Sequence, residues 1–195
     1  MRLGASGYVL IFIGLVSCMY VYHTSEYKQL KCIISDVDGN KYCVRERLKL
    51  NMAADRLASV NMRMKKLVNH CNKNKRGQEN VDRLVKGYNP QKIYETLPTS
   101  QYTAYSENKG EKLAFCLDTE KQEGKLIDMN TLTFVALHEL AHIATLSVGH
   151  TEEFWDNFKF LLGEAKDIGI YNPINYKTNP VRYCGMTIDD NPYYE

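Results

Sequence analysis

The chain has 195 residues, which is enough for one well-packed domain and little more. Hydrophobic residues make up 44% and charged residues 25% of it, a composition that excludes a largely disordered protein. The formal net charge of +2 gives no overall electrostatic reason to expect a nucleic-acid partner.

The N-terminus is the first segment with a clear pattern, because no charged residue occurs between Leu3 and Tyr22. At about 1.5 Å of rise per residue, a helix over this segment spans about 30 Å, the thickness of a hydrocarbon core. We expect residues 1–23 to form a single-pass transmembrane anchor and residues 24–30 to form a polar stalk. A cleaved signal peptide, which would make the protein secreted, and a lipid attachment at Cys18 are the alternatives.

The next segment predicts a β-hairpin and two helices. β-Branched residues on both sides of a turn predict a hairpin over residues 31–44, in which Cys32 and Cys43 face each other and pair in an oxidising compartment. Apolar residues at three- and four-residue steps predict a long amphipathic helix over residues 46–71. The further elements expected before the central helix are a short helix over 81–86 and a second hairpin with strands at 102–105 and 112–117.

Residues 45–76 are strongly basic, with ten Lys or Arg against two Asp or Glu. We interpret them as a solvated helix face, with contact to anionic lipid or to nucleic acid as the alternative. No aromatic residue is interleaved with these charges, so nucleic-acid bases would lack stacking partners. Nucleic acid is therefore not expected as a partner.

The last third of the chain predicts two helices and an irregular tail. The helices are expected over residues 131–146, begun by Asp128 or Asn130 as N-cap, and over 152–168, begun by Thr151. We expect residues 171–195 to be irregular apart from a strand near 182–188.

Chemistry is indicated by the H-E-x-x-H pattern on the first of these helices. His138 and His142 are four residues apart, so their imidazoles project from the same helix face and can hold one ion. A catalytic zinc site takes three protein ligands and leaves one position for a water molecule, whose pKa falls to about 7. Glu139 is placed to take a proton from that water as it attacks a carbonyl. The pattern therefore predicts a hydrolase with one catalytic Zn²⁺ and Glu139 as general base.

The third ligand has two candidates. Gly149 can adopt a left-handed turn that ends the helix, and His150, directly after it, can fold back towards the metal. Glu164 is the alternative, because zincins with a glutamate ligand place it on the following helix. Apart from the motif, the helix is almost wholly apolar, so a buried His138 and Glu139 would need a ligand to satisfy them.

These segments resemble a known family. The H-E-L-A-H motif, the Gly149–His150 pair and the Glu153–Trp155 segment are similar to those of the WLM and SprT-like zincin peptidases. Residues 134–171 resemble, more closely, metallopeptidase-like proteins of large nucleocytoplasmic DNA viruses. The spacing between the second and third histidines is longer than is usual in WLM proteins. The resemblance implies zinc-dependent peptide hydrolysis, with His138, His142 and His150 as metal ligands and Glu139 as the catalytic base.

The expected fold class is α+β. Residues 31–195 would form a minimal zincin-like metallopeptidase domain, with a small sheet packed on the active-site helix and a second helix following it. The expected partners are a polypeptide substrate and, through the N-terminal segment, a host or virion membrane; the oligomeric state is not indicated. Two alternative functions are a catalytically inactive zinc-binding membrane or envelope protein and a DNA-associated repair protease of the WLM/SprT type.

Substrate handling has weaker signals. We expect the strand over residues 112–117 to present a free edge to which an extended substrate can add, although it can equally be an ordinary sheet strand. Tyr105, Tyr176 and Tyr183 are candidates for stabilising the oxyanion, with ordinary packing as the default for each. Met186, after Cys184 and Gly185, is a candidate for a methionine turn beneath the zinc.

Overall fold

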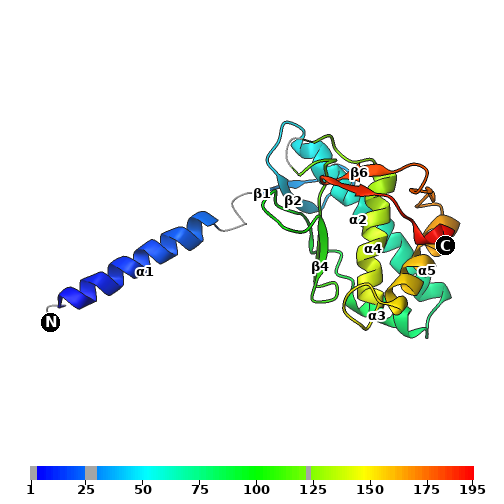
Figure 1. The fold of residues 1–195 in the computed structure, drawn as a ribbon, viewed down its shortest axis with the longest axis horizontal. Coiled ribbons are helices and arrows are strands. Elements are labelled where there is room, and N and C mark those ends of the chain that lie inside the picture. Colours follow the sequence, from blue (N-terminus) through cyan, green and yellow to red (C-terminus); the bar gives the residue numbers. More distant parts are fainter. Residues whose placement is uncertain (1–3, 25–29, 122–123) are drawn as a thin grey trace.

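The computed structural model describes residues 4–24, 30–121 and 124–195. Helix α1 (Ala5–Thr24) projects away from a folded body that begins at β1 (Figure 1). The large apolar side chains described in this helix, from Tyr8 to Val21, are exposed. The stalk expected over residues 24–30 lies almost entirely outside the described residues.

The N-terminal segment is helical, as expected, but its assignment as a transmembrane anchor is not supported. None of the helices within the described ranges has the length and hydropathy that a bilayer crossing requires.

Five strands form a mixed sheet in the order β1-β2-β3-β5-β4. Strands β1 and β2 form the expected antiparallel hairpin, and β4 and β5 form the second one. The two hairpins are joined through β3, which pairs in parallel with both β2 and β5. The strands are β1 (Leu30–Ile34), β2 (Lys41–Arg45), β3 (Ile93–Glu95), β4 (Ala104–Glu107) and β5 (Lys112–Phe115).

The strand order corrects the expectation that residues 112–117 present a free edge. Strand β5 lies between β3 and β4, so both of its sides are paired, and β4 is the edge strand. The error came from β3, which has only three residues and therefore shows no alternating pattern in the sequence. The free edge of the sheet therefore belongs to β4 and not to β5.

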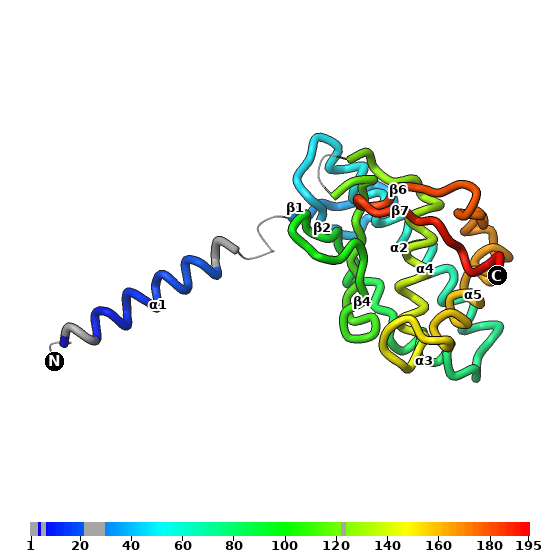
Figure 2. The backbone as a smooth tube through the Cα atoms, viewed as in Figure 1, coloured from blue at the N-terminus to red at the C-terminus, as the bar shows by residue number. Residues whose placement is uncertain are grey.

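Four helices pack in the folded body: α2 (Leu50–Asn74), α3 (Glu79–Gly87), α4 (Met129–Ala144) and α5 (Glu152–Asp167). Helix α2 contacts β1, β2 and β3. Helix α4 crosses the middle of the body and contacts α2, α3, α5 and the edge strand β4 (Figures 1 and 2). The expected small sheet, central helix and following helix are all present, and the fold is α+β.

Part of the basic stretch has a structural role that the sequence did not reveal. Arg63, on α2, donates hydrogen bonds to the carbonyl oxygens of Met129 and Ile170 at 3.3 and 2.9 Å. Lys66 donates to the carbonyl oxygen of Ile168 at 2.9 Å. Carbonyls at a helix C-terminus lack intrahelical partners and attract cations, so these two side chains hold the end of α5 against α2. The solvated-face interpretation is wrong for Arg63, which is half-buried, whereas Lys66 stays exposed while it makes its contact.

Two disulfides are present. Cys32 and Cys43 are direct cross-strand partners in the β1–β2 hairpin, and their predicted pairing is confirmed. Cys116, directly after β5, pairs with Cys184, which the sequence did not predict. Cys184 lies in the turn of a separate two-stranded hairpin made of β6 (Val181–Tyr183) and β7 (Met186–Ile188), where a single strand was expected. The tail ends in a short 3-10 helix, Pro192–Tyr194.

Candidate metal centre

Helix α4 carries the motif into the core of the body. The Asp128 carboxylate accepts hydrogen bonds from the backbone N–H groups of Asn130 and Thr131, each at 2.9 Å, so it is the predicted N-cap. Most of the helix is buried, and it ends at Ala144 rather than at residue 146. Because the helix is held on several sides, the two histidines of the motif have little freedom to move.

Three histidines meet at one point. The structure brings ligand atoms of His138, His142 and His150 within 4.8 Å of one another, and the Nε2 atoms of His138 and His150 are 3.0 Å apart. Zinc bonds of about 2.0–2.1 Å at tetrahedral angles place their nitrogen ligands about 3.3 Å apart. The three imidazoles therefore fit one zinc ion with a small adjustment.

His150 reaches the site through a short loop between α4 and α5. Gly149 has a φ of 88°, the left-handed conformation predicted for it, although it follows the helix end by several residues and does not itself end the helix. The Glu153 carboxylate, in the first turn of α5, accepts backbone hydrogen bonds from Leu146 and Ser147 at 3.0 and 3.2 Å. Arg83 of α3 binds the same carboxylate at 2.9 Å. A side chain of α5 therefore holds the backbone of the loop that precedes this helix.

Lys109 secures the other side of this loop. Its ammonium donates to the carbonyl oxygens of His142, Thr145 and Ser147 at 3.1, 2.7 and 2.8 Å. Two of these carbonyls belong to the end of α4, where they have no intrahelical partner. Lys109 lies in the β4–β5 turn and has a φ of 55°, a left-handed conformation unusual for a residue with a side chain. Burial lowers the pKa of Lys109, although its contacts with carbonyl dipoles keep the cation in place.

Burial sets the protonation of the site. It lowers the pKa of His138 to about 3 and that of His142 to about 4, with the neighbouring histidines adding to the effect. Both imidazoles are neutral near pH 7, so their lone pairs are free to bind a cation. Burial alone raises the pKa of Glu139 to about 8, because its side chain is enclosed without a cation beside it. A metal ion at the three histidines would stabilise the carboxylate.

Glu164, the alternative third ligand, lies elsewhere. Its carboxylate contacts His70 Nε2 at 2.9 Å and Lys75 Nζ at 3.0 Å, both on the α2 side of α5. Glu164 follows Glu153 by three helical turns, which places it about 16 Å further along α5. The alternative ligand is therefore wrong.

The histidines and Glu139 open onto a cleft. One side of it is formed by residues 99–109, which include β4, and the other sides by α4, the His150 loop, the start of α5 and residues 186–190. The predicted Tyr105, Tyr183 and Met186 line this cleft. Tyr176 is not among the lining residues of the described chain; it is fully buried with its ring edge-on to Phe134 at 5.0 Å.

The candidate roles of the two remaining tyrosines differ. The Tyr183 hydroxyl donates to the carbonyl oxygen of Thr103 at 3.2 Å, so it is already engaged with the backbone. Tyr105 stays a candidate for oxyanion stabilisation. Two supports of the site, Lys109 and Glu153, were missed from the sequence. Lys109 had only the turn glycine beside it as a signal, and Glu153 was noted only as part of the family resemblance.

Known proteins share the part of the chain that contains the histidine cluster. The model of the WLM family, described as the WLM domain, matches residues 81–189. The uncharacterized protein R325 of Acanthamoeba polyphaga mimivirus is 28% identical over 186 residues, which are 93% of this chain and 94% of that protein. Uncharacterized protein 136R of Invertebrate iridescent virus 6 is 35% identical over 83 residues, 42% of this chain and 44% of that protein. The expected similarity to proteins of large DNA viruses is confirmed.

Solved structures give a further comparison. A crystal structure of a mutant of Wss1 from Saccharomyces cerevisiae aligns with a TM-score of 0.49 and 15% identity, over 64% of this chain and 86% of that chain. The family model covers more than half of the chain and includes the three clustered histidines and Glu139. By this match, the chain belongs to the WLM family.

Proposed function

We propose that this chain is a zinc-dependent peptidase that hydrolyses peptide bonds in its cleft. The observation that carries the proposal is the meeting of His138, His142 and His150 at one point, with Glu139 in the wall of the same cleft. Three neutral imidazoles are a typical ligand set for a catalytic zinc, which keeps its fourth position open. The buried carboxylate beside them is the group that such a site needs as a base.

Each residue of the site has a distinct chemical task. Zinc, when held by the three histidines, supplies a Lewis acid that acidifies water and polarises a carbonyl. Glu139 takes a proton from the attacking water and returns it to the leaving amine. Glu139 is buried in the wall of the cleft, with 5% of the residue exposed.

The edge strand supports an extended polypeptide as the substrate. The backbone N–H of Cys116 donates to the carbonyl oxygen of Thr103 at 2.8 Å. Backbone groups of successive residues alternate between the two sides of an antiparallel strand. The N–H and C=O groups of Ala104 and Ser106 therefore point away from β5, along the free edge. An extended peptide can pair with them as an added strand.

The rim of the cleft supports a preference for apolar side chains. Four large apolar residues of the lining are exposed to solvent, namely Tyr102, Val148, Trp155 and Met186. Trp155 lies beside the His150 ring, with the ring centroids 5.6 Å apart, so it adjoins the reacting centre. Burying such side chains against a substrate is favourable in proportion to the area removed from water. We expect bulky apolar residues next to the cleaved bond.

Replacement of Glu139 by Gln tests the proposal. The amide cannot act as a base, so hydrolysis of a denatured protein substrate should fall by about 10²–10⁴-fold while zinc stays bound in a one-to-one ratio. Peptide cleavage is measured by mass spectrometry and zinc by elemental analysis of the same samples. Wild-type turnover in the Gln variant would contradict the proposal. Full zinc occupancy without cleavage by the wild-type chain would favour an inactive zinc-binding protein.

A further inference from the structure

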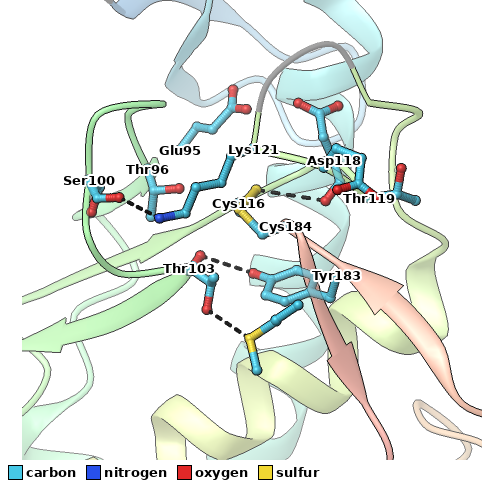
Figure 3. The surroundings of a disulfide bond; sticks show 12 residues. Glu95, Thr96, Ser100, Thr103, Cys116, Asp118, Thr119, Lys121, Tyr183 and Cys184 are labelled. Atoms are coloured by element: carbon cyan, nitrogen blue, oxygen red, sulfur yellow. Dashed lines mark hydrogen bonds between the residues drawn. A yellow bond between two sulfur atoms is a disulfide. The ribbon is translucent and has the colours of Figure 1, made fainter.

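The β6–β7 hairpin is attached to the end of β5 by a covalent bond and two backbone hydrogen bonds. Cys184, in its turn, pairs with Cys116, 68 residues earlier in the chain (Figure 3). The backbone N–H of Cys184 donates to the carbonyl oxygen of Asp118 at 2.9 Å, and that of Gly185 donates to Thr119 at 2.9 Å. The turn of the hairpin is therefore fixed to the segment that follows β5.

From this attachment the hairpin reaches Thr103, the residue just before the edge strand β4. The carbonyl oxygen of Thr103 accepts from the Tyr183 hydroxyl at 3.2 Å (Figure 3). It also accepts from the Cys116 N–H at 2.8 Å. The Thr103 hydroxyl donates to the Met186 sulfur at 3.6 Å. Thr103 is therefore bound by Cys116 of the disulfide and by two hairpin residues close to Cys184. Thr103 in turn sets where the free edge of β4 begins.

The segment after β5 is held more firmly than the β6–β7 hairpin that is attached to it. Asp118 is anchored by Arg47, whose guanidinium donates to both of its carboxylate oxygens at 2.7 and 2.8 Å. The hairpin has only three residues in each strand, and such a ribbon is marginally stable by itself. Met186 and Thr187, in β7, are exposed. Without the disulfide, the hairpin is therefore the half that moves.

Tyr183 is the buried part of the hairpin. Its side chain is 1% exposed and fills the core beside the cleft. Burial, with the nearby Glu139 carboxylate, raises the pKa of the Tyr183 hydroxyl, so this group stays protonated and remains a hydrogen-bond donor. The phenol therefore connects the hairpin to Thr103 through its hydroxyl.

We propose that the Cys116–Cys184 disulfide and Tyr183 form a clamp that positions Thr103, and with it the free edge of β4, for the peptide substrate. The inference rests on the proposed function for the identity of the substrate. All three are positioning residues, because none of them touches the reacting atoms. Hydrogen bonds to an added strand require the edge groups at their correct places, and a misplacement of about 1 Å can cost about 10²-fold in rate.

The chain offers a matched control for the disulfide. Cys32 and Cys43 join β1 to β2 at the opposite edge of the sheet from β4, and neither residue lines the cleft. The double variants C116S/C184S and C32S/C43S each remove one bond and add two hydroxyls. Tyr183→Phe removes only the hydroxyl and keeps the disulfide.

Steady-state kinetics on a peptide long enough to pair with β4, together with amide hydrogen exchange and zinc content, tests the clamp. We expect C116S/C184S to raise KM by about 10-fold or more, with a smaller increase in Y183F and little change in kcat for either. Amides of residues 103–107 should exchange faster in both variants, while those of residues 138–142 and the zinc content stay as in the wild type. C32S/C43S should match the wild type in KM and in exchange of residues 103–107.

Unchanged KM and exchange in C116S/C184S would overturn the clamp. Equal losses of kcat and zinc in both double variants would also overturn it, because they indicate a general loss of stability. If C116S/C184S does not fold, Y183F decides by the same measurements. If the wild-type chain cleaves no peptide, the proposed function fails, and the exchange of residues 103–107 still decides the clamp.

Discussion

The cleft has two walls that are held in place by different kinds of interaction. The ligand wall is the loop over residues 145–151, which carries His150. It is held by two charged side chains, Lys109 and Glu153, that bind its backbone. The hairpin wall is the β6–β7 hairpin, which is held by a disulfide, by the neutral hydrogen bond from Tyr183 to Thr103 and by an exposed ion pair between Arg182 and Glu120.

The edge strand β4 lies between these two walls and is connected to both of them. Thr103, at the start of β4, is bound by the hairpin wall, and Lys109, in the turn after β4, binds the ligand wall. Strand β4 is therefore held at both ends, at one end by hydrogen bonds to the disulfide-linked hairpin and at the other by the Lys109 ammonium. A disulfide is indifferent to pH and salt below the range where thiolates form, whereas partly exposed charges respond to both. The two walls should consequently fail under different conditions.

The largest expected effect is at the ligand wall. His150→Ala removes one of three metal ligands, so zinc affinity should fall by more than the roughly 10–100-fold that loss of an outer-shell partner costs. Competition with a chromophoric chelator measures it. Glu164→Gln is the control, because Glu164 binds His70 and Lys75 instead, and it should keep wild-type affinity. An equal loss in both variants would contradict the ligand assignment.

Lys109→Met should have the next largest effect. It keeps the apolar stem but removes two hydrogen bonds to the ligand wall and one to His142 at the end of α4, so zinc affinity should fall roughly 10-fold. Lys41→Met, at an exposed position on β2, is the matched control. The same chelator competition compares them. Wild-type affinity in the Lys109 variant would mean that the loop holds its shape without the ammonium.

Trp155→Ala tests the apolar rim. Loss of the indole should raise KM roughly 10-fold for peptides with bulky apolar residues at the cleaved bond, and much less for peptides with small residues there. Mass-spectrometric profiling of a peptide mixture gives both values. Met62→Ala, an exposed apolar position on α2, should leave the profile unchanged. A uniform change across all peptides would argue against a contact specific to apolar side chains.

The smallest expected effect distinguishes the two walls by pH. Backbone hydrogen bonds from Leu146, followed by Ser147 and Arg83, lower the pKa of Glu153 below its usual 4.5. A carboxyl with a lowered pKa stabilises the fold above the pKa of the unfolded state, and the stabilisation is lost as pH falls through the folded value. The Tm difference between wild type and Glu153→Gln should therefore be fully present above pH 4.5 and decrease as the pH falls from 4.5 through the lower pKa of the folded state.

Two controls complete this pH series. Glu152→Gln, at the neighbouring exposed position, should show no such pH-dependent difference in Tm. The Tm difference between the wild type and C116S/C184S should be nearly constant over the same acid range, because the disulfide that this variant lacks carries no charge. If the Tm difference between the wild type and C116S/C184S also depended on pH, the two walls would not differ in their response to acid.

Local patterns predicted the elements of the site well. The four-residue spacing of His138 and His142 and the Asp128 N-cap are properties of one helix, so the sequence contains all the information that they need. The pairing of Cys32 with Cys43 was also predictable, since a short turn brings the two residues opposite each other. Errors began where a prediction depended on segments far apart in the chain.

By itself, the sequence determined the helix that carries the motif, the position of Glu139 on it and the left-handed Gly149 before His150. Periodicity and turn chemistry act over a few residues and can be read locally. Tertiary structure decided that His150 rather than Glu164 lies beside the two motif histidines, and that β4 rather than β5 is the edge. It also brought Cys184 to Cys116. These outcomes depend on which surfaces pack together, and packing free energy is gained only between segments that the folded chain places in contact.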